Sequence, residues 1–417
     1  MDTRSNNTAP PVQKAQWGGA LLLVFAQATQ AMVFGSIALF LPLLRVDLGI
    51  SYSQAGLLAS ASVFSYAMMQ IPSGYVADRF DPRKIFLVGL VGVNVLSILF
   101  VVSTDFPVLV ANQFISGVFR SLLFSPGMIL ITRLFRPDQK ATGMGLFVAG
   151  GFSSNLVVNL LAPFLIEPLG WRGIFVLFSL TGLIAAVAFW KTTVSEPRPA
   201  TSALSVKEIA PTLREPVMIL VAVIQFVRLA LVTGMAFWLP SILQEDKGFS
   251  LQMAGLLVAL GSVITAPSNI VGGMVSDRLG KPIAVIVASM VAVGLTTIAL
   301  TLVEGLVGVI IVVAANALVL QLYFGPLFAV ATELLPHRQQ GLVTGIGNFW
   351  ANVGGFTASY VMGTIKEATG SFDVALYLLA SICIAGVGAA IGLDRLSKRT
   401  TRTPDDPNAE AAAAERI

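Results

Sequence analysis

Apolar runs recur along the whole chain, each about 18 to 25 residues long, and short segments with glycine, proline or charge separate them. About 20 apolar residues in a helix span the hydrocarbon core of a bilayer, which is roughly 30 Å thick. The pattern therefore predicts an all-α membrane protein with twelve transmembrane helices. The predicted spans cover residues 17–44, 52–76, 83–103, 106–132, 141–166, 171–190, 216–243, 251–275, 282–302, 306–331, 341–365 and 373–393.

Composition supports this prediction, because 55% of the 417 residues are hydrophobic and only 12% are charged. Such a balance is too apolar for a soluble globular protein. The single cysteine, Cys383, excludes an intrachain disulfide and a cysteine-based metal site. We expect no cofactor.

The basic residues predict the orientation in the membrane. With both chain ends on one side, that side holds twenty Lys and Arg and the other side four, while two of the 26 lie inside spans. We expect the protein to lie in the cell inner membrane. The positive-inside rule then predicts that both termini are cytoplasmic. The net charge of +4 thus reflects topology and indicates no nucleic-acid partner. Residues 1–16, which lack the apolar core of a signal peptide, and residues 394–417 are expected to be cytoplasmic tails.

The second half of the chain repeats the first at a shift of about 200 residues. GYVADR at 74–79 recurs as GMVSDR at 273–278, and an LLFSP segment recurs as LYFGP in the same order. Internal repeats of this kind are typical of transporters. We therefore expect two pseudo-symmetric six-helix bundles, 17–190 and 216–393, joined by a polar cytoplasmic linker at 191–215.

The repeated GxxxDR segment, with the basic residues that follow it, resembles the signature loop of the major facilitator superfamily. The resemblance implies the fold of that superfamily and a secondary transporter working by alternating access. It also implies that Asp78, Arg79, Asp277 and Arg278 form a cytoplasmic gate, which their pairing would lock in one conformation and release in another. The alternative is that these charges only anchor the loops at the lipid headgroups.

Two arginines, Arg120 and Arg228, lie near the middle of predicted spans, and no Asp or Glu lies at comparable depth. A guanidinium at the bilayer centre costs about 2.5–3.5 kcal/mol on the insertion scale, so it indicates a functional site. The planar guanidinium suits a carboxylate, phosphate or sulfonate, and we expect a small organic anion, a carboxylate first. The resemblance implies that the two spans concerned line the central cavity. Alternatively, backbone carbonyls and amide side chains satisfy each arginine between helices.

Polar side chains in other spans extend this candidate site. Gln113 precedes Arg120 by seven residues and shares its helix face, and Asn348 and Asn352 are four residues apart. Buried amides also hold helices together, at about 0.6 kcal/mol each, and this second interpretation stays open. Beside the two arginines, the candidate substrate-binding residues are Gln30, Gln27, Gln113, Gln225, Gln321, Tyr323, Asn348, Asn352 and Trp238.

Residues 345–378 resemble the eleventh-span region of the anion:cation symporter branch, whose members carry organic and inorganic anions. This resemblance favours proton-linked uptake. The residues themselves leave anion exchange and facilitated diffusion open, because all 22 acidic side chains map to loops, tails or span ends. Protons are thus a candidate partner beside the anion and the lipid bilayer, and we expect a monomer.

Multidrug or metabolite efflux is the rival function. A pump for cationic drugs would need a buried carboxylate, and none of the predicted spans carries one near its centre. An enzyme is not expected, since the sequence has no phosphate-binding loop, no metal-spaced His or Cys cluster and no nucleophile beside a base.

Overall fold

The structure is a computed structural model, and it describes residues 17–135, 140–193, 215–323, 326–327, 330 and 340–400. The predicted tail at 1–16, most of the linker and the end of the second tail lie outside these residues.

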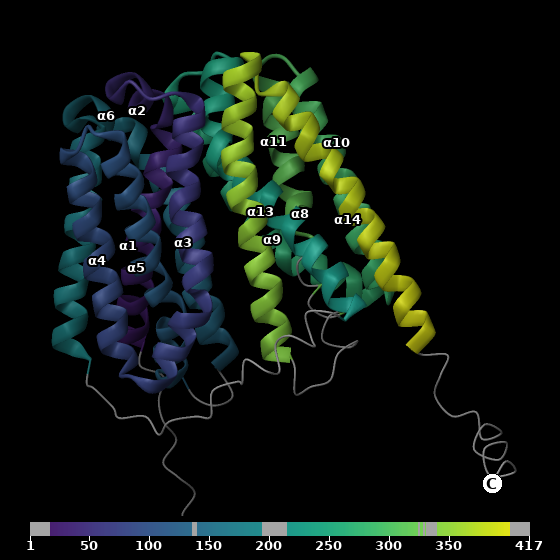
Figure 1. Cartoon of the computed structure of the whole chain (residues 1–417), viewed down its shortest axis with the longest axis horizontal. Coiled ribbons are helices and arrows are strands. Elements are labelled where there is room, and N and C mark those ends of the chain that lie inside the picture. Colours follow the sequence, from purple (N-terminus) through teal and green to yellow (C-terminus); the bar gives the residue numbers. More distant parts are fainter. Residues whose placement is uncertain are drawn as a thin grey trace, which may run out of the picture.

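Within the described residues all regular structure is helical, and the helices form two groups that stand side by side (Figure 1). The first group comprises α1 (Trp17–Leu39), α2 (Leu41–Leu48), α3 (Tyr52–Arg79), α4 (Pro82–Val102), α5 (Phe106–Arg133) and α6 (Lys140–Thr192). The second comprises α8 (Pro216–Ser241), the π-helix η2 (Ile242–Asp246), α9 (Leu251–Leu279), α10 (Pro282–Leu302), α11 (Leu306–Leu320), α13 (Gln340–Thr369) and α14 (Asp373–Thr400). Helix α6 is broken at Gly170, whose φ of 62° is not helical, and therefore supplies two spans. The predicted fold of two six-helix bundles is confirmed.

Two predicted spans differ from the helices observed. The first was expected to continue to residue 44, but α1 ends at Leu39 and α2 starts at Leu41 with Pro42 in its first turn, where proline is tolerated. The tenth was expected to run from 306 to 331, but α11 ends at Leu320 and a turn follows at residues 321–323. Pro326 has no N–H for the carbonyl of Leu322, four residues earlier, so that carbonyl loses its usual helical hydrogen bond.

The last helix, α14, continues to Thr400, beyond the predicted span end at 393. The beginning of the predicted C-terminal tail is therefore helical. Lys398 and Asp394 form an ion pair one turn apart in this extension, which is a spacing that favours helix.

The equivalent helices α3 and α9 both start with a serine cap. At the start of α3, Ser51 Oγ accepts from the Gln54 backbone N–H (3.2 Å) while Gln54 Oε1 accepts from the Ser51 N–H (2.8 Å), forming a capping box. At the start of α9, Ser250 Oγ accepts from the Met253 N–H at 3.2 Å. For this pair, the internal repeat predicted from the sequence extends to the signal that begins the helix.

The two groups contact one another closely at the end where α2 lies, and they diverge toward the end where α1 begins and α14 ends (Figure 1). Glycines permit the close approach. A Cβ on Gly56 of α3 would lie 2.8 Å from the Ser359 carbonyl oxygen of α13, and a Cβ on Gly363 would lie 2.5 Å from the Tyr52 carbonyl oxygen. We call this the closed end and the opposite one the open end.

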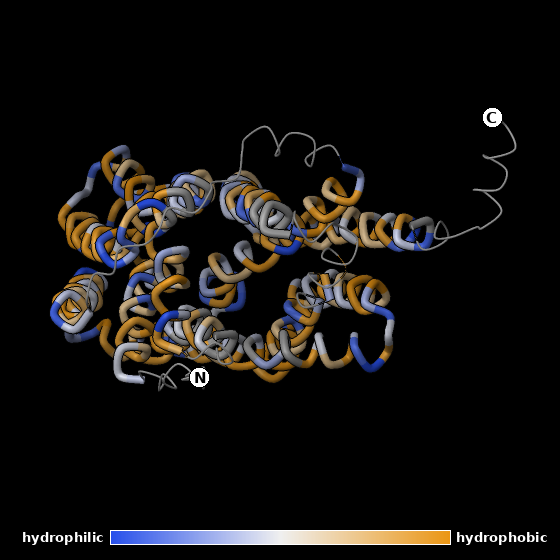
Figure 2. Tube along the Cα trace, turned by 90° about the horizontal axis from the view of Figure 1, so that it is seen from below, coloured by the Kyte–Doolittle hydropathy of each residue, from blue (hydrophilic) through white to orange (hydrophobic). Residues whose placement is uncertain are grey.

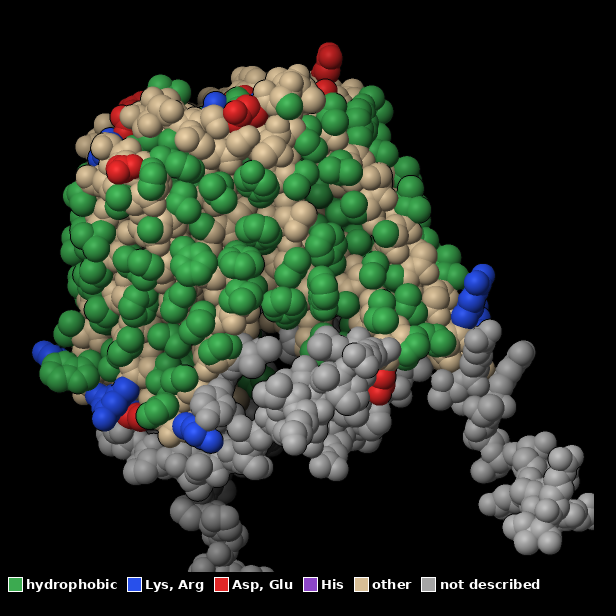
Figure 3. All heavy atoms as spheres, in the orientation of Figure 1, with side chains coloured by type: hydrophobic (Ala, Val, Ile, Leu, Met, Phe, Trp, Pro, Cys, Tyr) green, Lys and Arg blue, Asp and Glu red, His purple; other side chains and the backbone are tan. Residues whose placement is uncertain are grey.

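The outer surface has the polarity that a bilayer requires. Hydrophobic side chains cover the middle of the face seen in Figure 3, whereas charged side chains lie at its top and bottom. Figure 2 views the helices nearly end-on, and hydrophobic (orange) turns occur in both helix groups. Seven described helices are long and apolar enough to cross a membrane by length and composition. Ile184, Leu295 and Ile384 are 68%, 63% and 75% exposed, respectively, as expected for lipid-facing positions.

Candidate transport site

Arg120 lies where α1, α3 and α5 converge. Its Nε donates to Gln30 Oε1 at 3.0 Å, and its Nη1 donates to Ser62 Oγ at 3.1 Å. The guanidinium carbon lies 4.1 Å from the ring centre of Phe34 and 5.6 Å from that of Tyr66, within the range of cation–π attraction.

All four neighbours of Arg120 are uncharged, and no carboxylate of the described residues lies within ion-pair distance of it. The sequence-based expectation that this arginine has no acidic partner therefore agrees with the geometry. Two N–H groups are used by the amide and the hydroxyl, and the guanidinium has further donors that can hold an anion.

Arg228 lies on α8 and is 6% exposed. Its Nε donates to Gln225 Oε1 at 2.7 Å, one turn earlier on the same helix, and Tyr323, from the turn after α11, lies near it. Tyr323 is fully buried, and its hydroxyl has no hydrogen-bond partner among the described residues. Gln225 packs against α13 at Gly347. The structure thus brings together three of the predicted site residues in the second group.

The remaining predicted residues lie at varied places. Gln113 shares a recess of about 10 Å³ with Arg120 and Gln30. The side chain of Gln27 is buried, and its Oε1 has no partner among the described residues. Asn352 donates to the Asn348 backbone oxygen at 2.8 Å, within α13.

Trp238 lies at the closed end. Its Nε1 donates to the Ser359 carbonyl oxygen at 2.9 Å, and its ring centre lies 5.1 Å from Phe372 and 6.4 Å from Tyr52. Trp238 follows Arg228 by ten residues on α8, which is about 15 Å along the helix. Its position indicates a role in sealing the two groups together.

A larger cavity of about 240 Å³ lies between the groups, lined by α1, α6, α8, α9, α10, α11 and the turn after α11. Gln321 lines it, but neither arginine does. Phe34 lines both this cavity and the small recess that holds Arg120. Phe34 therefore contacts both spaces, and its ring centre lies 4.1 Å from the guanidinium carbon of Arg120.

The sequence-based search missed several residues of this region. Phe34 follows Gln30 by four residues, so helical spacing alone could have found it. Asn155 and Asn159 form an i,i+4 pair that lines the cavity, as Asn348 and Asn352 form one in α13. Ser62 sits in an ordinary serine-rich stretch and gave no signal.

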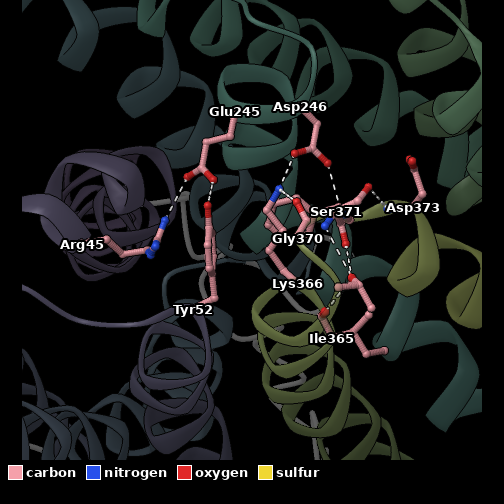
Figure 4. Close-up of polar contacts among 11 residues, drawn as sticks. Arg45, Tyr52, Glu245, Asp246, Ile365, Lys366, Gly370, Ser371 and Asp373 are labelled. Carbon is pink, nitrogen blue, oxygen red and sulfur yellow. Dashed lines mark hydrogen bonds and ion pairs between the residues drawn. The ribbon is translucent and has the colours of Figure 1, made fainter.

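Polar and charged side chains also cluster at the closed end, as Figure 4 shows. Arg45 of α2 pairs with Glu245 of η2 at 3.4 Å, and the Tyr52 hydroxyl of α3 donates to the same carboxylate. The guanidinium of Arg45 also lies 3.2 Å from the Tyr52 ring centre. Glu245 therefore joins the two helix groups.

The adjacent residue, Asp246, contacts residues of its own helix group, the second one. Lys366 Nζ lies 2.5 Å from Asp246 Oδ1 and 3.0 Å from the Gly370 carbonyl oxygen, and the Phe372 backbone N–H donates to Asp246 Oδ2 at 3.0 Å. We call Arg45, Tyr52, Glu245, Asp246 and Lys366 the closed-end cluster.

Glu367, beside Lys366, adds a further bond between the groups, because it accepts from the Ser53 backbone N–H at 2.7 Å. Hydrogen bonds from the side chains of Ser51 and Ser53 and from that N–H lower the pKa of Glu367 to about 2. A depressed pKa means that the stabilising charge is present at neutral pH and is lost only as pH falls toward 2.

The gate predicted from the sequence lies at the open end. Arg79, Asp277 and Arg278 are exposed, and Asp277 and Arg278 make no ion pair with any residue that the structure describes. The side chain of Asp78 lies outside the described part. Among the described residues, the ion pair that joins the two groups, Arg45 with Glu245, lies at the opposite end from the predicted gate.

The sequence profile of the Major Facilitator Superfamily matches residues 23–359, and the chain belongs to this superfamily of multi-pass membrane transporters. Among solved structures, it is similar to a bacterial homologue of the human lysosomal transporter Spinster in its inward-facing and occupied conformation. The TM-score is 0.74 at 15% identity, covering 95% of this chain and 98% of that one.

Curated relatives extend over most of the chain. The probable sulfoacetate transporter SauU of Cupriavidus necator is 24% identical, with 91% of this chain and 93% of that protein covered. The probable galactarate/D-glucarate transporter GudP of Bacillus subtilis is 24% identical, with coverage of 82% and 83%. The hexuronate transporter of the same species is also 24% identical, with coverage of 87% and 91%. The family and these relatives are transporters rather than enzymes.

Proposed function

We propose that this protein carries a small organic anion, a carboxylate or sulfonate, across the cell inner membrane by alternating access. The observation that carries the proposal is the environment of Arg120, a part-buried guanidinium whose partners among the described residues are an amide, a hydroxyl and two aromatic rings. A carboxylate or sulfonate would provide the missing negative charge and a bidentate partner. The relatives named for sulfoacetate, glucarate and hexuronate support an organic acid anion.

The first helix group supplies the primary anion contact in this proposal. Arg120 binds the anion, while Gln30 and Ser62 orient the guanidinium and exchange bonds with the arriving ligand. Arg228 with Gln225 and Tyr323 is the corresponding element of the second group. An anion attracted to both arginines favours the approach of the two groups, which is the step that alternating access needs.

In this proposal the open end faces the cytoplasm and the closed end faces outside, which the distribution of basic residues supports. The conformation described is then open to the cytoplasm, with the closed-end cluster holding the outer side shut. Opening to the outside requires that the bonds from Glu245 to Arg45 and Tyr52 break. Transport is proton-linked uptake or anion exchange in this proposal, and Asp78, Arg79, Asp277 and Arg278 form the gate of the cytoplasmic side in the outward-open state.

Uptake into proteoliposomes tests the proposal. The purified protein is reconstituted and offered labelled sulfonates, monocarboxylates and dicarboxylates, with a hydrophobic cation as the counter-probe. We expect uptake of at least one anion, and the Arg120→Gln variant should reduce it about 100-fold, because a charge-assisted bidentate contact is lost. Arg172→Gln is the matched control, since this arginine pairs with Asp47 at the surface and its side chain is 41% exposed. Uptake of the cation alone, unaffected by Arg120→Gln, would contradict anion transport and favour efflux of cationic compounds.

A further inference from the structure

The cavity between the two helix groups has a chemistry unlike that of the arginine sites. None of its described lining residues is charged. Most of its wall is hydrocarbon or aromatic, from side chains such as Phe34, Met235, Phe237, Val258 and Val313. A ligand part that lies here must itself be largely apolar, because a polar group that leaves water needs a hydrogen-bond partner.

Two buried acceptors in the cavity wall lack such a partner. The Oδ1 of Asn159 and the Oε1 of Gln321 have no hydrogen-bond partner among the described residues, and both residues are more than nine-tenths buried. The Nδ2 of Asn159 donates to the Asn155 carbonyl oxygen at 2.7 Å. Both oxygens are covered by protein in this conformation. Buried acceptors are normally satisfied, so a turn of either amide toward the cavity would let it accept from a ligand O–H or N–H group.

The cavity is connected with Arg120 through Phe34. This ring borders the cavity on one side and lies 4.1 Å from the guanidinium on the other. The recess at Arg120 has room for about one water molecule, whereas the cavity has about 240 Å³. An anionic group at Arg120 and a larger apolar body in the cavity can therefore belong to one molecule if the Phe34 ring turns aside.

We propose that the substrate is an amphipathic monoanion. It has a carboxylate or sulfonate for Arg120, an aromatic or branched hydrocarbon body for the cavity, and a hydroxyl or amide N–H for Asn159 or Gln321. An apolar cavity of about 150 Å³ holds benzene in another protein, so the cavity here has room for a substituted ring. The inference rests on the proposed function and refines it. A polyhydroxylated sugar acid fits this cavity less well than an aromatic acid, because most of the wall is apolar and a hydroxyl that leaves water needs a hydrogen-bond partner.

Competition against uptake in the reconstituted full-length protein tests this inference. The probes are the three hydroxyphenylacetate isomers, phenylacetate as the analogue without a donor, and galactonate as the sugar acid. We expect the best hydroxyphenylacetate isomer to bind about tenfold more tightly than phenylacetate, as the loss of one hydrogen bond to a buried acceptor predicts. Galactonate should bind more weakly than either.

Two variants locate the effect. Asn159→Leu should remove the preference for the hydroxylated ring while leaving phenylacetate binding in place. Gly261→Phe should fill the cavity, because a Cβ at this position points toward Val313 and Ala317 at 3.8 and 3.7 Å. Gly388→Phe on α14 is the matched control, since its Cβ would meet nothing within 4 Å. Only the cavity variant should abolish aromatic anion binding.

The outcomes separate this inference from the proposed function. If galactonate is taken up in an Arg120-dependent way and no aromatic anion competes, the amphipathic substrate is overturned while anion transport stands. If Gly261→Phe and Gly388→Phe behave alike, the cavity does not hold the substrate body. If no anion is bound at all, the proposed function fails and this inference fails with it.

Discussion

The closed end and the middle of the membrane hold their charges in opposite ways. At the closed end, Arg45 and Lys366 pair with Glu245 and Asp246 within 3.4 Å. In the middle, Arg120 is held by neutral groups only. In an ion pair within the protein, each charge is neutralised without a ligand, and the pair can separate where water enters. A cation among neutral groups has no opposite charge from the protein, so an anionic ligand can supply it. The comparison assigns conformational control to the first region and substrate recognition to the second.

The largest loss of uptake is expected when the two helix groups cannot pack together at the closed end. In Gly363→Leu, the new side chain would have to displace the Tyr52 backbone and the Trp238 ring, which a Cβ would already approach to 2.5 and 2.9 Å. The closed end should not form, and uptake should fall to background. Size-exclusion elution of the purified variant checks that it folds. Gly388→Leu, at a lipid-facing glycine, is the control and should transport normally.

A smaller effect is expected from weakening the closed-end cluster. Glu245→Gln removes the charge that pairs with Arg45 and weakens the bond from Tyr52. The two contacts together amount to about 1–2 kcal/mol at a partly exposed site, so the conformational equilibrium should shift roughly tenfold toward opening at this end.

Thiol labelling measures that shift. Cys383 is replaced by Ser, Ala38→Cys is introduced in the wall of the cavity, and a membrane-impermeant reagent is added from the outside. Faster labelling in Glu245→Gln than in the parent is the predicted result. Equal labelling rates would mean that the cluster does not control access.

A modest loss of anion affinity is expected when the hydrogen bond from Arg120 Nη1 to Ser62 is removed. Ser62→Ala removes the hydroxyl that lies 3.1 Å from Nη1, and the loss of about 1 kcal/mol corresponds to roughly fivefold weaker anion binding. Gly56→Ala is not a suitable control, because a Cβ there clashes with α13. Ser103→Ala, outside the spans at the end of α4, serves instead and should leave affinity unchanged.

The smallest effect is expected at the exposed pair of Arg172 and Asp47. Their side chains are 41% and 42% exposed, and surface ion pairs contribute about 0–1 kcal/mol. Arg172→Gln should therefore change neither the unfolding temperature nor the uptake rate measurably. A large loss of uptake would show that the closed-end control extends farther than the closed-end cluster.

Much of this architecture could be predicted from the sequence, because a bilayer imposes a periodic apolar pattern that is readable without coordinates. The spans, the internal repeat and Arg120 were found in that way. The break after α11 could not be located, because the equivalent proline of the first half, Pro126, lies inside the continuous helix α5.

The closed-end cluster was also missed. Arg45 and Glu245 lie 200 positions apart, and each looks like an ordinary charged residue at a span end. Only the packing of the two groups brings them together. Likewise, the sequence predicted Trp238 as a substrate-binding residue because it lies on the same helix as Arg228. In the structure it donates to the Ser359 carbonyl oxygen at the closed end.

The most direct test of the account concerns the thermal stability of Arg120→Gln, with and without the transported anion. If Arg120 awaits a ligand, removing its charge should leave the ligand-free protein at least as stable as the wild type, because a buried cation without an acidic partner costs folding free energy. The same substitution should abolish the rise in unfolding temperature that the anion produces in the wild type. A ligand-free variant that melts well below the wild type, yet is still stabilised by the anion, would show that Arg120 only holds helices together and would contradict the account.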